Sequence, residues 1–342
     1  MKIGITYDLR QDYLDMGYGE EETAEFDRIG TIDAIDTTLK AFGHETDRIG
    51  NIWNLTQRLA HGNRWDLVFN IAEGMYGIGR EAQVPALLDA FNIPYTFSDP
   101  LVLSLTLHKG MTKRVLRDLK IPTPDFCEIC SEQDIENVHL PFPLFAKPIA
   151  EGTGKGINSA SKIHNKTELK GICLALLQQY RQPVLVETFL PGREFTVAIA
   201  GTDERARSLG VMEVILNKNA EQHAYSYINK EQCDELVTYK PVQDLLAQRA
   251  VETALASWRG IGCRDAGRVD LRTDVKGVPN IMEINPLAGI HPEHSDLPII
   301  CTFYGISYRQ LFAMILESAM ERIKPQTTIV GKVADGCCCS VC

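Results

Sequence analysis

Two short polar patterns in the sequence point to the same chemistry. In IMEINPLAG, residues 281–289, Glu283 and Asn285 stand two residues apart in an otherwise apolar run. In GRVDLRTD, Arg268 and Asp270 have the same spacing. Side chains two residues apart lie on the same face of a strand. Each segment would therefore present a pair of polar groups on one face of a sheet.

The two segments predict a β-hairpin with a specific register. Polar and apolar residues alternate on both sides of a Lys-Gly dipeptide that lies between them, which is typical of two strands joined by a turn. If the hairpin is symmetric about that dipeptide, Asp270 faces Glu283 and Arg268 faces Asn285. Two carboxylates directly opposite each other repel, so we expect a cation between them. Such oxygens suit Mg²⁺, which binds one or two carboxylates together with substrate phosphates and waters.

Phosphate-binding features occur earlier in the chain. In FAKPIAEGTGKGI, Lys147 ends an apolar run and is followed by Gly152, Gly154 and Gly156. Glycines allow backbone N–H groups to turn toward phosphate oxygens, and a lysine adds positive charge. A second candidate lysine is Lys109, in LHKGMTKRVL. The spacing differs from the P-loop pattern GxxxxGK[ST], so we interpret the stretch as a flexible hairpin over phosphates.

A third segment, VLVETFLPGREF, has groups suited to a nucleoside. Glu187 ends an alternating strand and Glu194 follows a Pro-Gly corner. Unpaired backbone groups at residues 188–190 could bond an adenine edge, and a carboxylate could hold ribose hydroxyls. Simpler explanations exist for every pattern, among them an exposed acidic hairpin with an Arg268 salt bridge, a mobile surface turn and a solvated lysine. The joint occurrence of the patterns favours magnesium carrying phosphate.

The elements that must position these groups follow from periodicity. MKIGITYD and WDLVFNI have the composition of buried strands, and AIDTTLKAFGHET and REAQVPALLDAFN that of helices. This order predicts a parallel, doubly wound sheet, followed by an α+β pattern of hairpins and helices. We expect an N-terminal domain over residues 1–100, a region with the glycine-rich loop over 101–195, a region with the metal-binding hairpin over 196–325, and a tail over 326–342.

Composition excludes several classes of function. The chain has 342 residues, of which 44% are hydrophobic and 23% charged, and its net charge is -10. No basic block is interleaved with aromatic residues, which argues against a nucleic-acid partner. No apolar run approaches the roughly 18 residues of a membrane span, and the N-terminus lacks a signal-peptide pattern. We expect a cytoplasmic protein with no membrane partner.

Taken in order, five segments resemble the D-alanine–D-alanine ligase family of ATP-grasp enzymes: HKGMTKRVL, KPIAEGTGKGI, VETFLPGREFTVAI, GRVDLRTD and MEINPLAGIHPEHS. The resemblance runs from FNIAEG to the last helix. It implies an α/β fold, α+β in its C-terminal half, with a three-subdomain ATP-grasp architecture whose N-terminal subdomain is a doubly wound parallel sheet. It also implies a homodimer that joins two small, amino-acid-like substrates, using ATP and two Mg²⁺ ions, through an acylphosphate.

The resemblance assigns roles to individual residues. ATP would be held by Lys109, Lys147, Thr153, Glu187, Phe189, Leu190 and Glu194, and the two Mg²⁺ ions by Asp270, Glu283 and Asn285. Around the reacting groups, Arg268 and the backbone at Gly289 would stabilise the tetrahedral intermediate, Lys230 would belong to a mobile loop, Ser295 would bind the second substrate's carboxylate, and Glu25 would bind an ammonium group.

Departures from the family pattern are concentrated where the first substrate should bind. The entry loop is replaced by YDLRQDYLDMGYGEEETAEFD, which is longer and acidic. A family histidine is replaced by Glu73, and a tyrosine by Glu231. Added carboxylates favour cationic partners. D-alanine is the default substrate, and the alternatives are a ligase that makes another dipeptide, a depsipeptide or a peptide adduct, and a non-catalytic nucleotide-binding homologue.

The C-terminal sequence KVADGCCCSVC holds four cysteines in six residues, Cys337, Cys338, Cys339 and Cys342. Adjacent cysteines can bind soft metals or be modified. We expect a tail without a catalytic role.

Overall fold

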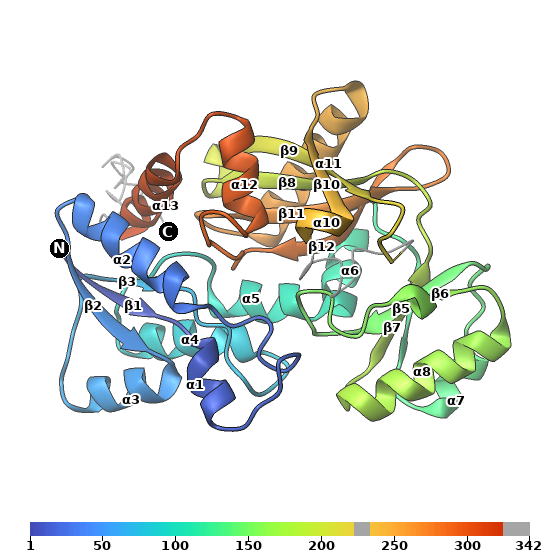
Figure 1. The fold of residues 1–342 in the computed structure, drawn as a ribbon, viewed down its shortest axis with the longest axis horizontal. Helices are drawn as coiled ribbons and strands as arrows, with labels where there is room; N and C mark the ends of the chain where they lie inside the picture. Colours follow the sequence, from blue (N-terminus) through green and yellow to red (C-terminus); the bar gives the residue numbers. More distant parts are fainter. Residues whose placement is uncertain (222–232, 324–342) are drawn as a thin grey trace, which may run out of the picture.

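Three separate β-sheets form the framework of the protein (Figure 1). The computed structural model describes residues 1–221 and 233–323. Lys230, Glu231 and the cysteine-rich tail lie outside the described residues, so the roles assigned to them stay predictions.

The first sheet is parallel, as predicted, with the strand order β2-β1-β3. Strand β2 was not expected from the sequence. It lies at the sheet edge, where only Ile49 and Gly50 are buried, so its sequence ETDRIG lacks an apolar pattern. The elements of this region are β1 (Lys2–Thr6), α1 (Arg10–Asp15), α2 (Ile29–Ala41), β2 (Glu45–Gly50), α3 (Ile52–Ala60), β3 (Leu67–Asn70), the 3-10 turn η1 (Arg80–Ala82) and α4 (Gln83–Ala90).

Two short helices lead from the first sheet to the second. Asp99 caps α5 (Pro100–Leu107) by accepting the N–H of Val102. His108 follows and caps α6 (Lys109–Asp118) through its ring nitrogen, which accepts the N–H of Met111 at 3.2 Å. This cap places Lys109 in the first turn of α6.

The second sheet is antiparallel, with the order β4-β7-β5-β6. Helix α8 runs along one face of this sheet (Figure 1). Its residues Leu169, Cys173 and Leu176 pack against the strands and bury that face. The predicted glycine-rich connection leaves β5 and returns to the same sheet at β6, which pairs with β5. The elements are β4 (Phe126–Ile129), α7 (Glu132–Glu136), β5 (Leu144–Pro148), η2 (Ser159–Ser161), β6 (Lys162–Ile163), α8 (Lys166–Tyr180) and β7 (Val184–Thr188).

The third sheet is antiparallel, with the order β10-β9-β8-β11-β12. One of its faces packs on α11, and the other packs on α12. Phe312 of α13 stacks on Phe69 of the first sheet at 5.0 Å between ring centroids, which packs α13 against that sheet. The elements are β8 (Glu194–Ala200), η3 (Asp203–Arg205), β9 (Arg207–Leu216), α10 (Cys233–Leu236), β10 (Val237–Pro241), α11 (Leu245–Ile261), β11 (Ala266–Thr273), β12 (Pro279–Asn285), α12 (Asp296–Phe303) and α13 (Tyr308–Ile323).

The predicted hairpin register is confirmed. Arg268 pairs with Asn285 and Asp270 pairs with Glu283. The symmetry ends there, because Leu271 pairs with Ile281 and the register shifts by one residue. The shift is a β-bulge, which increases local twist and redirects side chains.

Among the described residues, no single helix is long and apolar enough to cross a membrane. Helices α12 and α13 are long and apolar enough only when taken together, and they are bent by 114° relative to each other.

Candidate active site

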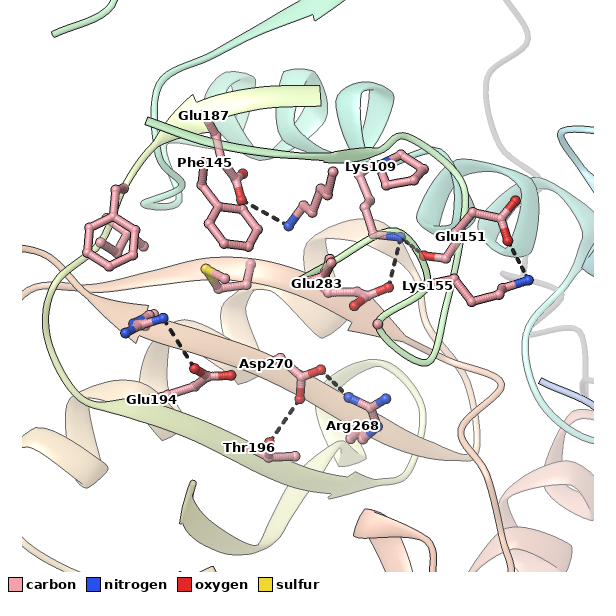
Figure 2. Close-up of a pocket in the computed structure, with 18 of the residues that line it drawn as sticks. Lys109, Phe145, Glu151, Lys155, Glu187, Glu194, Thr196, Arg268, Asp270 and Glu283 are labelled. Atoms are coloured by element: carbon pink, nitrogen blue, oxygen red, sulfur yellow. Dashed lines mark hydrogen bonds and ion pairs between the residues drawn. The ribbon is translucent and has the colours of Figure 1, made fainter. Parts of the chain in front are cut away.

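A cavity lies between the second and third sheets and encloses about 860 Å³, part of it open to solvent (Figure 2). Its walls come from β5, the glycine-rich loop, β7, the Pro-Gly corner and the acidic hairpin. The lining residues are Lys109, Phe145, Lys147, Pro148, Glu151, Gly154, Lys155, Ile157, Glu187, Thr188, Phe189, Leu190, Glu194, Thr196, Arg268, Asp270, Arg272, Met282, Glu283 and Asp296. Most of the predicted ATP and metal residues therefore meet in one place.

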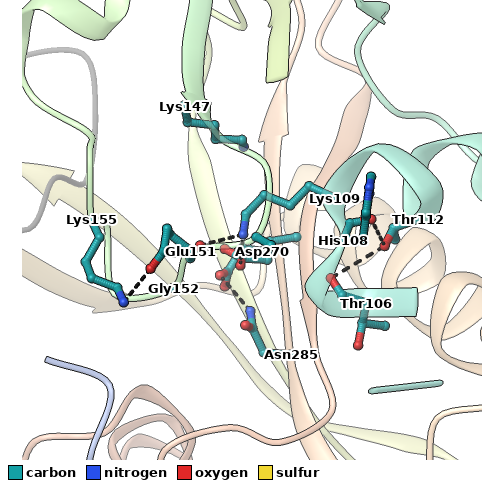
Figure 3. A network of polar contacts seen from close by, with 12 residues as sticks. Thr106, His108, Lys109, Thr112, Lys147, Glu151, Gly152, Lys155, Asp270 and Asn285 are labelled. Carbon is teal, nitrogen blue, oxygen red and sulfur yellow. Dashed lines mark hydrogen bonds and ion pairs between the residues drawn. The ribbon is translucent and has the colours of Figure 1, made fainter. Parts of the chain in front are cut away.

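Lys109 connects the glycine-rich loop to the acidic hairpin. Its ammonium donates to the carbonyl of Glu151 at 2.6 Å and lies 3.0 Å from Oε1 of Glu283. Figure 3 shows the Lys109 ammonium next to Glu151 of the loop. The Lys109 side chain is only 5% exposed, so its charge is poorly screened by solvent.

The Glu187 carboxylate lies between two lysines. Oε1 is 2.9 Å from the ammonium of Lys147, and Oε2 is 2.8 Å from that of Lys113. Burial alone would raise the pKa of Glu187, but the two ammonium groups outweigh it and lower the pKa to about 2. Glu187 is therefore a buried counter-ion for two lysines.

The hairpin carboxylates are also paired with cations. Asp270 forms an ion pair with Arg268 and accepts hydrogen bonds from Thr196 at 3.0 Å and from the amide of Asn285 at 3.3 Å. The Nε of Arg268 lies 3.6 Å from Asp296. Burial would lower the pKa of Arg268, but Asp270 and Asp296 outweigh it and raise the pKa. The guanidinium is held charged at the cavity wall.

The side-chain oxygens at this site suit Mg²⁺ only if a bound ligand and waters supply the remaining oxygens. No group of three or more His, Cys, Asp and Glu side chains that could hold a metal ion is found within residues 1–221 and 233–323. Asp270 and Glu283 face each other across the hairpin and Asn285 contacts Asp270. Two carboxylates and one carboxamide are enough for Mg²⁺ when phosphates and waters complete the octahedron.

The apolar end of the cavity is formed by Phe145, Phe189 and Leu190. The ring of Phe189 lies 4.4 Å from the ammonium of Lys162 and 5.2 Å from the guanidinium of Arg272, measured from the ring centroid. The backbone is less available than predicted. The N–H groups of Thr188 and Phe189 donate to Asp125 and Pro143, so the expectation that residues 188–190 are unpaired is wrong for these two donors.

Glu25 closes the glycine-rich loop against the N-terminal region. Its carboxylate accepts hydrogen bonds from Arg80 at 2.7 Å and from the N–H of Gly152, and lies 3.3 Å from the ammonium of Lys155. Arg80 also donates to the carbonyl of Ala150 at 2.8 Å. A Cβ at Gly152 would collide with the carboxylate, so a larger residue there would displace the Glu25 side chain.

Thr153 adopts a left-handed conformation, with φ of 48°. Its hydroxyl is buried and has no hydrogen-bond partner among the described residues. A buried, unsatisfied hydroxyl costs free energy, which a bound ligand could recover.

Within the described part of the chain, five predicted residues are absent from the cavity wall, namely Glu25, Thr153, Asn285, Gly289 and Ser295. The hydroxyl of Ser295 accepts the N–H of His291 at 2.9 Å, and an added Cβ at Gly289 would lie 2.9 Å from that hydroxyl. Asp296, the next residue, lines the cavity, whereas Gly289 and Ser295 do not. They are close to the site but separated from it by their neighbours.

Acidic side chains gather near the proposed first-substrate end. Burial raises the pKa of Glu73 well above its ordinary value, and the carboxylates of Glu81 and Glu25 raise it further. Burial raises the pKa of Glu81 to about 8, although Arg80 opposes the shift. Within the described chain, neither Glu73 nor Glu81 forms an ion pair.

Sequence reasoning missed several residues of the site. Lys113 lies four positions after Lys109, on the same helix face, and that spacing could have revealed it. Lys155 stands inside the glycine-rich stretch itself. Arg272, Asp296 and Thr196 carried no signal that could be recognised, because only the fold brings them to the cavity.

Comparisons with known proteins agree with this geometry. Residues 115–317 match the profile described as the D-ala D-ala ligase C-terminus. A D-alanine–D-alanine ligase from Bordetella avium is 32% identical over 265 residues, covering 76% of this chain and 80% of the relative. The fold is similar to the crystal structure of a Bacillus anthracis D-alanine–D-alanine ligase complexed with ATP, with a TM-score of 0.72 at 22% identity over 94% of this chain and 97% of the other. It is also similar to the VanG D-Ala:D-Ser ligase from Enterococcus faecalis, with a TM-score of 0.71 at 18% identity over 93% of this chain and 99% of the other.

These matches confirm the predicted ATP-grasp architecture. The profile match covers more than half of the chain, and it includes β5, the glycine-rich loop and the acidic hairpin. The chain belongs to the D-alanine–D-alanine ligase family, whose members are ATP-dependent, peptide bond-forming ligases.

Proposed function

We propose that this protein joins the carboxylate of one amino acid to the amine of another, with D-alanine as the default for both. The observation that carries the proposal is the cavity in which Lys109 and Lys147 meet the hairpin carboxylates of Asp270 and Glu283. Cations on one side suit ATP phosphates, and acids on the other suit magnesium.

The reaction would take place in two steps. A substrate carboxylate oxygen attacks the γ-phosphorus of ATP, the bond to ADP breaks, and an acylphosphate forms. The second substrate's amine then attacks the acyl carbon, and phosphate leaves as the tetrahedral intermediate collapses. No residue forms a covalent bond with the substrate, so the protein contributes orientation and charge neutralisation.

Roles for the nucleotide residues follow from their positions. Lys109 and Lys147 would neutralise phosphate oxygens, and the unsatisfied hydroxyl of Thr153 would donate to one of them. Phe189 and Leu190 would enclose adenine, with the ribose hydroxyls held by Glu194. The side chain of Glu187 would act as the counter-ion of Lys147.

Magnesium would be held by Asp270, Glu283 and Asn285, as two ions. When bound, Mg²⁺ neutralises phosphate charge and makes the γ-phosphorus a better electrophile. Arg268 would then face the developing oxyanion, together with backbone groups near Gly289, while Ser295 would bind the second substrate's carboxylate. Glu25 would bind an ammonium group by exchanging Arg80 or Lys155 for it.

A cationic first substrate is a second candidate. Burial raises the pKa of Glu73 and the Glu81 carboxylate raises it further, and burial together with Glu25 raises the pKa of Glu81. A substrate with an extra positive charge would relieve this repulsion between carboxylates. The substrate would then be a basic amino acid or a diamine derivative, joined by the same two steps.

The organisation of the protein is part of the proposal. Each of the regions 1–100, 101–195 and 196–325 would be a subdomain built on one sheet. We also propose a cytoplasmic homodimer that binds neither nucleic acid nor membrane.

Phosphate release from Mg·ATP tests the proposed function. The panel would contain D- and L-amino acids, hydroxy acids and polyamines, with product masses measured in parallel and Glu283→Gln as the control. D-alanine-dependent release matched by dipeptide is the expected result. Release matched to another product would replace the substrate, whereas ATP binding without release on any panel member would contradict ligase activity on these substrates.

A further inference from the structure

Lys113 is a buried lysine that no part of the proposed function uses. It lies on α6 and is 1% exposed. Its ammonium donates to the hydroxyl of Thr123 at 2.9 Å and to the carbonyl of Ile281 at 3.5 Å. It also lies 2.8 Å from Oε2 of Glu187. Lys113 does not line the nucleotide cavity, so it cannot be a direct phosphate ligand in this arrangement.

The neighbouring charges explain why a second lysine matters. Glu187 is 1% exposed and Lys147 is 4% exposed, and Oε1 of Glu187 lies 2.9 Å from the Lys147 ammonium. Without Lys113, the pair of Glu187 and Lys147 would carry no net charge. With Lys113 on the other oxygen, the three side chains carry one net positive charge. Buried charges are weakly screened, so that excess would act on phosphates at the cavity wall.

We propose that Lys113 is a positioning residue of the nucleotide site. By pairing with one oxygen of Glu187, it prevents that carboxylate from neutralising Lys147 and leaves Lys147 to attract the phosphates of ATP. It also fixes the Glu187 side chain, because Thr123 and Ile281 hold the Lys113 ammonium in place. The inference rests on the proposed function, since it takes the cavity to be the ATP site.

Two substitutions made in turn test this role, the first removing a positive charge and the second a negative one. Lys113→Met keeps an unbranched side chain but removes the charge, so Glu187 pairs with Lys147 alone. Binding of Mg·AMPPNP, measured by calorimetry on the full chain, is expected to weaken at least about tenfold. The ATP KM of the ligase should rise by more than kcat falls. Adding Glu187→Gln restores the net positive charge, and the double variant is expected to bind within about threefold of wild type.

A structural role for Lys113 makes a different prediction. If Lys113 only ties α6 to its neighbours, the double variant will bind no better than Lys113→Met, and that result would overturn the inference. Equal binding by Lys113→Met and wild type would overturn it as well. Lys170→Met is the matched control, because Lys170 is an exposed lysine paired with Glu132 at 2.7 Å, and its removal should leave affinity unchanged.

Thermal melts of each variant monitor folding. Should Lys113→Met not fold, Glu187→Gln alone decides the question, since losing the competing carboxylate should leave affinity equal or tighter, and weaker binding would contradict the inference.

The wild-type protein tests the proposed function separately. Wild-type protein that binds the analogue but makes no ligation product contradicts ligation only, and wild-type protein that does not bind it contradicts both.

Discussion

The two ends of the proposed active site differ in how their charges are balanced. In the nucleotide cavity, every acid of the hairpin and of β7 has a cation nearby: Glu283 with Lys109, Asp270 with Arg268, and Glu187 with Lys147 and Lys113. At the N-terminal end, Arg80 and Lys155 balance Glu25. The pKa values of Glu73 and Glu81 are nevertheless raised, because burial and neighbouring acids act together.

This difference separates two parts of the function. A cavity with paired charges is organised for a ligand of fixed chemistry, such as ATP with its metal ions. An end with crowded carboxylates stores electrostatic repulsion, and a bound cation would relieve it. The proposed function therefore keeps the nucleotide chemistry of the family, while the proposed substrate end carries crowded acids of its own.

The largest effect is expected from a substitution in the proposed nucleotide site. Asp270→Asn removes a proposed magnesium ligand and the partner of Arg268, so substrate-dependent phosphate release should fall about a thousandfold, since metal-assisted charge stabilisation is worth several kcal/mol. Asp274→Asn is the matched control, because Asp274 lies in the same hairpin and only accepts backbone N–H groups of its own turn. Equal loss of rate in both variants would mean that the hairpin acts through stability and not through metal binding.

A substitution of Arg80 tests the proposed substrate end of the site. Arg80→Met removes the donor that holds Glu25 and the Ala150 carbonyl, so the glycine-rich loop loses one anchor to the N-terminal region. The KM for the carboxylate substrate is expected to rise about tenfold, in line with the loss of a charged hydrogen bond. ATP affinity should change much less. A tenfold loss of ATP affinity with an unchanged substrate KM would place Arg80 at the nucleotide end instead.

The smallest effect concerns stability and pH. The pKa of Glu81 is about 8 in the folded protein against an ordinary value of 4.5, so between these values the folded state binds more protons than the unfolded state. Stability should therefore fall as pH rises through this window. Glu81→Gln removes this loss and should stabilise the protein by about 1 kcal/mol at pH 8, with no gain at pH 4. This figure is well below the full value of the pKa difference, because Glu81 is only partly buried and solvent screens its charge. Urea unfolding at the two pH values measures it, and a gain that is the same at both would exclude titration of Glu81 as the cause.

The fold and the nucleotide site were predictable where local pattern carried the information. Alternation around the Lys-Gly turn predicted that Asp270 faces Glu283, and the structure has that pair. The bulge after it was not predictable, because only packing requires the register shift. Strand β2 escaped prediction because an edge strand with few buried residues has no apolar alternation.

The substrate end was predicted less well for a different reason. The family resemblance predicts that Glu25 binds an ammonium group, and in the structure its partners are Arg80, Lys155 and the N–H of Gly152. These contacts join segments far apart in the sequence, so no local spacing reveals them. Lys113 could have been found from its position on α6, but its pairing with Glu187 depends on β7.

The most direct test of carboxylate activation follows oxygen from substrate to phosphate. D-alanine labelled with ¹⁸O in its carboxylate would be incubated with Mg·ATP and the enzyme, and the released phosphate analysed by mass spectrometry. An acylphosphate requires that phosphate leaves with one carboxylate oxygen, so each phosphate released with product should carry one ¹⁸O atom. Dipeptide formed together with unlabelled phosphate would contradict the account, because the carboxylate would then have been activated without a bond to the γ-phosphorus.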